Sequence, residues 1–407
     1  MGSNHRGSQT KCLPAWADMA DPVIYLDHQA STPCRADVLA AMAPWWSEHC
    51  ANPSSRLHRS GLRAAAALEQ ARGRIGIALG VDLAAQPQRL VFTSGATEAN
   101  NLALKGLAEA ELAAGGQRRH LISVVSEHRA VLDPLQHLAR HGFTLTTLPV
   151  GPDGLLDPGR LEAALRPDTL LVSVMAANNE IGVLQPLAAI AGLCRARAIT
   201  IHCDAAQAVG HIPLHPDALG IDLLSLSGHK LGGPPGIGAL LIAPGLTLAP
   251  QQHGGGQEHG LRAGTAPLPL IVGLGVAVQQ AVATQPQRSA RLAALRDQLW
   301  QHLQAIGGIH RNGAAAPRLA HNLNVRVDGV DGAALHSRLR RQLAVSSGSA
   351  CGGGAPSHVL QALGLSRQQA AASIRFGLGA DTTAAEIEAA AAVVRDAVQT
   401  LRRGPAG

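Results

Sequence analysis

Apolar residues along the chain are grouped into short runs that alternate with longer stretches of helix-like spacing. Continuous runs bounded by Gly, Pro or polar residues are typical of buried strands, and apolar positions three or four residues apart are typical of helices. The predicted strands are residues 23–27, 89–93, 121–125, 144–148, 170–175, 199–203, 222–230 and 238–242. The predicted helices between them are residues 37–48, 61–79, 94–114, 130–141, 158–165 and 186–198. This alternation predicts an α/β fold with a mostly parallel sheet covered on both faces.

The pattern changes near residue 267. A long helix over 267–287, another over 289–306, a strand over 322–327 and helices after Pro356 and Thr382 predict a second, α+β domain. The first 22 residues have no apolar core of the signal-peptide type and are expected to form a disordered tail.

Composition narrows the choice of partner. Aromatic residues make up only 2% of the chain, so the core must be built from Ala, Leu, Val and Ile, and no apolar run reaches the length of a membrane span. The net charge is +6, but the arginines are scattered and aromatic stacking residues are scarce. A small anionic ligand or an acidic protein therefore fits the charge better than nucleic acid, and no membrane or direct nucleic-acid binding is expected.

The six cysteines show no Cys-x-x-Cys spacing. This predicts neither a zinc site nor a disulfide framework, so no metal is expected. A reducing cytoplasm is the expected compartment.

Lys230 is one of only three lysines among 34 basic residues, the others being Lys11 and Lys105. It ends a predicted strand before a Gly/Pro-rich turn, at the sheet edge where α/β proteins build their sites, with Ser227 and His229 beside it. Lysine, unlike arginine, can become a neutral nucleophilic amine. A lysine that merely extends from a strand end to solvent has the same spacing, so both readings stay open.

Polar residues follow other predicted strands in the same way. His128 is either structural or a neutral ring that stacks and shuttles protons. Asn178 and Asn179 form an Asx turn or hold a carboxylate or a phenolic oxygen. Asp204 lies 26 positions before Lys230, an interval that lets both side chains face one cleft. A carboxylate there would keep a bound ring nitrogen protonated.

Three further segments carry candidate chemistry. The turn at 94–97 places free N–H groups at a helix N-terminus, which suits an anion, although Ser94 or Thr97 as part of an ordinary capping box is the commoner arrangement. Cys351 lies in a small, glycine-rich loop and has the setting of a reactive thiol. Arg375 lies inside an apolar run, where its guanidinium needs a substrate carboxylate or a structural Asp or Glu.

Taken together, these segments resemble the fold-type I pyridoxal-phosphate enzymes of the aminotransferase class-V family, and closely the group I cysteine desulfurases of the NifS/IscS type. The matching stretches, in the family's order, are residues 25–27, 52–55, 94–101, 126–128, 178–182, 204–207, 227–230, 253–258, 262–265, 346–351 and 373–375. Any one of them is weak, but the ordered set is specific.

The resemblance implies a large domain over residues 38–285 with a seven-stranded, mostly parallel sheet, and a small α+β domain from residues 23–37 and 286–407. Lys230 would carry pyridoxal phosphate as a Schiff base and shuttle protons. Asp204 would pair with the pyridinium nitrogen, Gln207 would bond the ring's phenolic oxygen and His128 would stack on the ring. The other implied cofactor-binding residues are Ala96, Thr97, Asn179, Ser227, His229 and, from the neighbouring subunit of a homodimer, Thr265.

For the substrate, L-cysteine, the resemblance implies that Asn179 and Arg375 fix the carboxylate. Cys351 would take the sulfur as a persulfide, release alanine and pass the sulfur to an acceptor protein. Iron–sulfur cluster assembly, transfer-RNA thiolation, cofactor biosynthesis and DNA sulfur modification are all open destinations.

Two alternatives and two departures remain. A related lyase, such as a selenocysteine lyase, would not need Cys351, and a partner-binding protein with an inactive fold would not bind the cofactor. The loop at 352–356 is shorter than expected for the group, and the chain stops at Gly407 without the long tail by which some members dock a scaffold.

Overall fold

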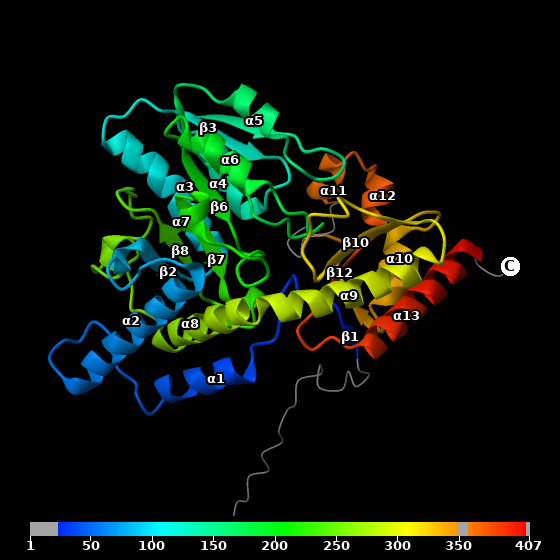
Figure 1. Ribbon diagram of the computed structural model, residues 1–407, viewed down its shortest axis with the longest axis horizontal. Coiled ribbons are helices and arrows are strands. Elements are labelled where there is room, and N and C mark those ends of the chain that lie inside the picture. The colour runs from blue at the N-terminus through cyan, green and yellow to red at the C-terminus, as the bar shows by residue number, and fades with distance from the viewer. Residues whose placement is uncertain (1–22, 349–356, 404–407) are drawn as a thin grey trace, which may run out of the picture.

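The computed structural model describes residues 23–348 and 357–403, which form a main body on one large sheet and a smaller body beside it (Figure 1). Within these residues the large sheet has seven strands in the order β2-β8-β7-β6-β5-β3-β4. Their bounds are β2 Leu90–Thr93, β3 His120–Val124, β4 Thr144–Leu148, β5 Thr169–Ser173, β6 Thr200–Asp204, β7 Leu223–Ser227 and β8 Gly238–Ile242. The strands from β7 to β4 run parallel, and β8 is antiparallel to β2 and β7. The predicted fold class is confirmed.

Alternate side chains of the central strands enter different hydrophobic cores. In β7, Leu223 packs in one core, whereas Leu224 and Leu226 pack in another. The helices that contribute to these cores are α2 (Arg59–Leu79) and α8 (Leu268–Ala283) in the second, and α3 (Ala96–Ala113) and α4 (Arg129–Ala139) in the first. Helices α5 (Pro158–Ala164) and α6 (Leu187–Arg195) enclose a further core, and the short α7 spans Pro216–Leu219. Burial on both faces explains the continuous apolar runs.

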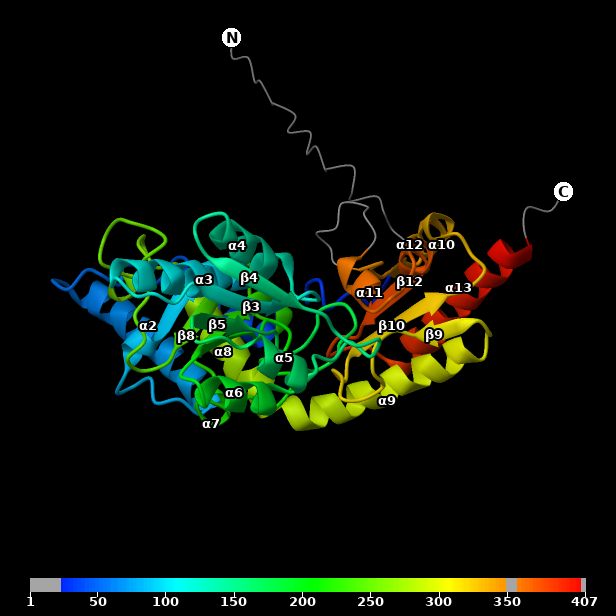
Figure 2. The same ribbon diagram turned by 90° about the horizontal axis from the view of Figure 1, so that it is seen from above.

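The smaller body has its own sheet and its own core (Figure 2). Among the described residues its sheet is antiparallel, with the order β12-β10-β9. The bounds of its elements are α9 Gln285–Gln304, β9 Ile309–Arg311, β10 Asn322–Val327, α10 Gly332–Leu339, α11 His358–Ala362, α12 Arg367–Ala371, β12 Ser373–Gly377 and α13 Ala384–Arg403. This arrangement is α+β, while the predicted domain boundaries stay a prediction.

The first described segment connects the two bodies. Strand β1 (Ile24–Tyr25) pairs with β11 (Leu343–Ala344) in a parallel two-stranded sheet, and Leu26 packs in the smaller core. Helix α1 (Ala36–Met42) follows and lies along α8 of the main body (Figure 1). Between β1, which belongs to the smaller body, and α1, which packs on the main body, the chain passes through the region of the candidate site.

The structure differs from the sequence prediction in three places. The helix expected over 37–48 ends at Met42 and continues as a 3-10 helix, Ala43–Trp45, which has Pro44 in its first turn. The strand before Lys230 ends at Ser227, and Lys230 closes a 3-10 helix, Gly228–Lys230. The short elements β9, α10 and β12 were not predicted, because their apolar runs are too brief to distinguish helix from strand.

Among the described helices, no single one combines the length and the hydropathy that a membrane crossing needs. Helices α8 and α9 reach them only together, as a pair bent by 69°.

Candidate active site

A cavity of about 470 Å³ lies at the carboxyl ends of the parallel strands. It gathers nearly all of the site residues predicted from the sequence. Those that line it are Ala96, Thr97, His128, Asn179, Asp204, Gln207, Ser227, His229, Lys230 and Arg375. Two predicted residues are not in this set: Thr265 does not line the cavity, and Cys351 lies outside the described residues.

Lys230 is held by backbone carbonyls of the N-terminal segment. Its Nζ donates to the carbonyl oxygens of Gln29 at 2.6 Å and Ala30 at 2.8 Å. Because two acceptors, 201 and 200 positions away in sequence, orient the amine, the lysine is not a surface cation at a strand end.

Asp204, at the end of β6, is only 7% exposed. One carboxylate oxygen accepts from Asn100 Nδ2 at 2.8 Å, and the other accepts from the Ala206 amide at 3.0 Å. None of the ion pairs found among the described residues involves this carboxylate. A buried anion held only by neutral donors suits a protonated ring nitrogen.

His128 is the N-cap of α4, and its Nδ1 accepts from the Ala130 amide at 3.1 Å. This bond assigns any ring proton of the neutral form to Nε2. Burial lowers the pKa of His128, with the Asp204 carboxylate opposing the change and Lys230 adding to it. A neutral imidazole at neutral pH is what stacking on a cofactor ring requires.

The N-terminus of α3 carries no side-chain cap. Its N-cap is Gly95, so the ordinary capping box with Ser94 or Thr97 as cap is wrong. The Ser94 amide instead donates to Glu98 Oε2 at 2.7 Å, and Glu98 pairs with Arg262 at 2.9 Å. The first-turn amides of a helix that lacks a side-chain cap suit an anion.

Ser227 and His229 line the same cavity from the end of β7 and the following 3-10 helix. The pKa of His229 is lowered to about 4, first by burial and then by the Lys230 charge. His229 is therefore a neutral hydrogen-bonding group near pH 7.

The two asparagines after β5 have different places. Asn178 makes the Asx turn, because its Oδ1 accepts from the amides of Glu180 at 2.8 Å and Ile181 at 3.0 Å. Asn179 lines the cavity. The Asx turn is therefore confirmed for Asn178, and a ligand-binding role for Asn179 stays a prediction.

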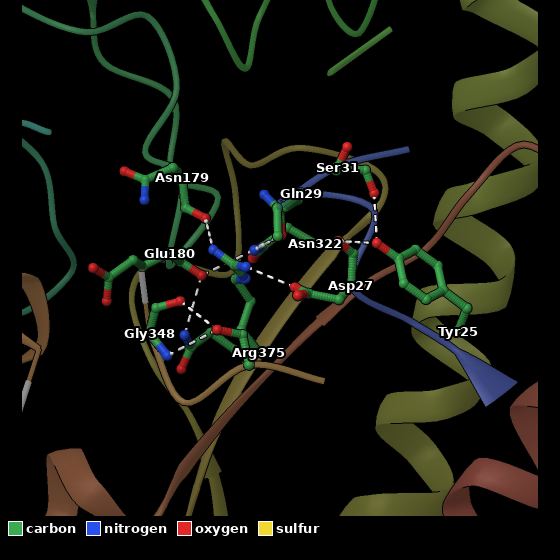
Figure 3. Close-up of polar contacts among 12 residues, drawn as sticks. Tyr25, Asp27, Gln29, Ser31, Asn179, Glu180, Asn322, Gly348 and Arg375 are labelled. Carbon is green, nitrogen blue, oxygen red and sulfur yellow. Dashed lines mark hydrogen bonds and ion pairs between the residues drawn. The ribbon is translucent and has the colours of Figure 1, made fainter. Parts of the chain in front are cut away.

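Arg375, on β12, is 1% exposed and lines the cavity. Its Nη2 pairs with Asp27 Oδ1 at 2.7 Å, and its Nη1 donates to the Asn179 carbonyl at 2.9 Å (Figure 3). The structural carboxylate that the sequence left open is thus present. The segment that leads to residue 351 lies beside it, since the Arg375 amide donates to the Ser346 carbonyl at 2.7 Å.

Sequence reasoning missed three residues of the site. Asn100 holds Asp204, and its place on the buried face of α3, one turn after Thr97, is a signal that was available. Gln29 accepts through its carbonyl from Lys230 and, at 3.0 Å, from Gln207 Nε2. Neither Gln29 nor Asp27 has a local sequence signal of its role, because their partners are far away in the chain.

Thr265 is exposed in the loop after the 3-10 helix Glu258–Gly260. Glu258 anchors this loop: its carboxylate accepts from the Phe92 amide at 2.8 Å and pairs with Arg72 Nη2 at 3.2 Å. Arg72 also pairs with Glu69, at 3.2 Å, but Glu69 is half exposed.

Cys194, on α6, and Cys203, on β6, are buried. Burial raises the pKa of Cys194 to about 12 and that of Cys203 well above its ordinary value, so both thiols are inert. A second cavity of about 530 Å³ also reaches Lys230, but among the other predicted site residues it contains none.

The residues of the first cavity fit pyridoxal phosphate. The α3 N-terminus with Thr97 and Ser227 offers donors for a phosphate, Asp204 offers an anion for a ring nitrogen, and Lys230 offers an amine for an aldehyde. The cavity volume is in the usual range for ligand sites. The fold and the site together define a pyridoxal-phosphate-dependent enzyme of fold type I.

Comparisons with known proteins identify the family. The aminotransferase class-V model matches residues 24–390. The cysteine desulfurase IscS of Tolumonas auensis is 46% identical, covering 93% of this chain and 93% of that protein, and IscS of Rickettsia akari is 43% identical, covering 93% and 92%. A solved structure described as a NifS-like protein has a TM-score of 0.87 and 33% identity, covering 93% of this chain and all of that chain. The chain belongs to the aminotransferase class-V family, and the predicted NifS/IscS-type resemblance is confirmed.

Proposed function

We infer that this protein is a cysteine desulfurase that converts L-cysteine into L-alanine and carries the sulfur as a persulfide on Cys351. The observation that carries this inference is one cavity lined by Lys230, Asp204 and Arg375, in a chain 46% identical to an IscS desulfurase. An amine, a carboxylate for a ring nitrogen and a guanidinium for a substrate carboxylate are the groups that this chemistry needs.

The residues that would hold the cofactor come from separate elements. When bound, pyridoxal phosphate supplies an electron-withdrawing ring on which bonds at the substrate carbons are weakened. Lys230 would hold its aldehyde carbon, Asp204 its ring nitrogen and Gln207 its ring oxygen, with His128 against the ring face. The phosphate would lie at the α3 N-terminus, bound by Ala96, Thr97, Ser227 and His229.

Proton transfer is assigned to Lys230 and His128. Lys230 would take and return a proton at Nζ, which the Gln29 and Ala30 carbonyls orient. His128 has Nδ1 occupied by the Ala130 amide, so Nε2 is the atom that would exchange a proton.

The substrate carboxylate would be bound by Arg375 and Asn179, which both line the cavity and are joined by the hydrogen bond from Arg375 Nη1 to the Asn179 carbonyl. In the sulfur step, the Cβ–S bond of cysteine breaks and an S–S bond forms to the Cys351 sulfur. Cβ gains one proton to become the methyl group of alanine, and Cys351 exchanges its S–H for an S–SH. Atoms and electrons balance without an added oxidant or reductant.

Replacing Cys351 by Ser tests the function. Sulfide release from L-cysteine, measured with a reducing thiol present, should fall to background, while the visible absorbance of the bound cofactor should persist. Full desulfurase activity in this variant would refute the role of Cys351. Activity on selenocysteine but not on cysteine would favour a selenocysteine lyase instead.

We propose that the protein acts as a homodimer in the cytoplasm. Support for the dimer is the exposure of Thr265 on a loop anchored by Glu258, which suits a contact to the neighbouring subunit's cofactor. Support for a reducing compartment is that the spacing of the six cysteines predicts no disulfide framework. The persulfide would pass to an acceptor protein, a scaffold or a sulfur carrier.

A further inference from the structure

Residues 27–30 touch several groups of the proposed active site at once. The Asp27 carboxylate pairs with Arg375 at 2.7 Å. The Gln29 carbonyl accepts from Lys230 at 2.6 Å and from Gln207 at 3.0 Å. These four residues therefore contact both Arg375, the proposed partner of the substrate carboxylate, and Lys230, the proposed catalytic amine.

We propose that Asp27 is a positioning residue for substrate recognition: it fixes the Arg375 guanidinium so that the free N–H groups of that guanidinium bind the α-carboxylate of cysteine. This inference rests on the proposed role of Arg375 and assigns a new role to Asp27. Asp27 itself does not contact the substrate in this scheme.

The hydrogen bonds of Arg375 leave room for a second carboxylate. A guanidinium has five N–H groups, two of them on each terminal nitrogen. Nη2 uses one on Asp27 and Nη1 uses one on the Asn179 carbonyl, so with respect to the described residues each terminal nitrogen keeps one N–H for a ligand. Acceptors from two different segments thus hold the guanidinium on both sides (Figure 3).

Burial explains why an anion is needed there before the substrate arrives. The Arg375 side chain is 2% exposed, and its Nε has no partner among the described residues. A buried cation without a counter-ion is strongly destabilising, and a long side chain without fixed partners loses its orientation. Asp27, with its side chain 21% exposed, supplies the negative charge that compensates Arg375 and the hydrogen-bond acceptor that orients its guanidinium.

Backbone hydrogen bonds to β12 fix the position of Asp27 relative to Arg375. Asp27 forms a bridge with Gly377 of β12, where the Gly377 amide donates to the Leu26 carbonyl at 2.7 Å and the His28 amide donates to the Gly377 carbonyl at 3.1 Å. A Cβ at Gly377 would lie 2.8 Å from the Gln29 amide nitrogen, so glycine permits this close approach. Asp27 is therefore fixed two residues along the strand from its partner.

The test separates carboxylate recognition from general damage. Binding of L-alanine, the product, is measured by the change in cofactor absorbance and compared with binding of ethylamine, which has the amine but no carboxylate. Asp27→Ala should weaken L-alanine binding by roughly tenfold or more, the loss expected for a charge-assisted hydrogen bond, and change ethylamine binding by less than about twofold. Asp27→Asn keeps an acceptor oxygen and should show a smaller loss.

The controls fix the interpretation. Asp37→Ala removes an exposed ion pair, to Arg35, from the same region and should leave both affinities unchanged. Unchanged or tighter L-alanine binding in the Asp27 variants, or an equal loss for ethylamine, overturns the proposal; tighter binding would mean that Asp27 competes with the substrate. If Asp27→Ala does not fold, Asp27→Asn alone decides by the same criterion.

Arg375→Ala distinguishes this proposal from the function on which it rests. If Arg375→Ala leaves L-alanine binding unchanged, the substrate site itself is wrongly assigned. If Arg375→Ala weakens it and the Asp27 variants do not, only the role of Asp27 fails. A melting curve of each cofactor-free variant provides a readout that is independent of activity.

Discussion

The buried ion pair between Arg72 and Glu258 gives the sharpest stability prediction. Arg72 pairs with two glutamates at the same distance, 3.2 Å, but Glu258 is 7% exposed and Glu69 is 54% exposed. Glu258→Gln should leave the Arg72 charge buried without its main counter-ion, at a cost of about 3–5 kcal/mol. Glu69→Gln should cost less than about 1 kcal/mol, because water already screens that pair.

The assay is thermal unfolding of the cofactor-free protein. A domain of about 150–250 residues shifts its unfolding midpoint by about 2–4 °C per kcal/mol. On this scale, Glu258→Gln should lower the midpoint of the main body by roughly 6–20 °C. Glu69→Gln is the matched control, since it removes the same charge from the same arginine and should shift the midpoint by no more than about 4 °C. Equal shifts in the two variants would refute the argument that burial decides the strength of the pair.

Two further predictions concern His202 and Lys230. Burial lowers the pKa of His202 to about 4, against 6.5 in the unfolded chain, so its neutral form stabilises the fold fully above pH 6.5 and this stability is lost as the pH falls towards 4. Between pH 6.5 and 4, the His202→Asn variant should therefore lose about 3 kcal/mol less unfolding free energy than the parent. Its melting temperature should fall less steeply with decreasing pH, and an unchanged slope would contradict the prediction. Lys230→Arg should keep a cation but abolish sulfide release, because a guanidinium is not a nucleophilic amine, and activity above about one thousandth of the parent would argue against Lys230.

The site residues at the ends of strands could be predicted from the sequence, because their residue types contrast with the buried apolar strands before them. Buried parallel strands are apolar throughout, so Asp204 stands out directly after one of them. Lys230 stands out by its type in a chain rich in arginine. Since parallel strands end at one edge of the sheet, placing both residues in one cavity followed from the order of the elements alone.

The contacts between the two bodies were not predictable in this way. The Asp27–Arg375 pair joins residues 348 positions apart, and the Gln29–Lys230 bond joins residues 201 positions apart. Nothing in the local pattern near Asp27 or Gln29 records these partners, because tertiary packing alone creates them. The absence of a side-chain cap on α3 was missed for a similar reason, since Glu98 takes the Ser94 amide while paired with Arg262 of a distant loop.

The passage of the N-terminal segment between the two bodies also affects how the protein is made. Residues 24–30 are synthesised before the main sheet, whereas β11 and β12, on which β1 and Asp27 are aligned, are synthesised after it. The main sheet has all its described strands once residue 242 is made, yet the acceptors of Lys230 and the partner of Arg375 fall into place only after β12, which ends at Gly377, has been made. Assembly of the proposed active site therefore reports that both bodies have folded.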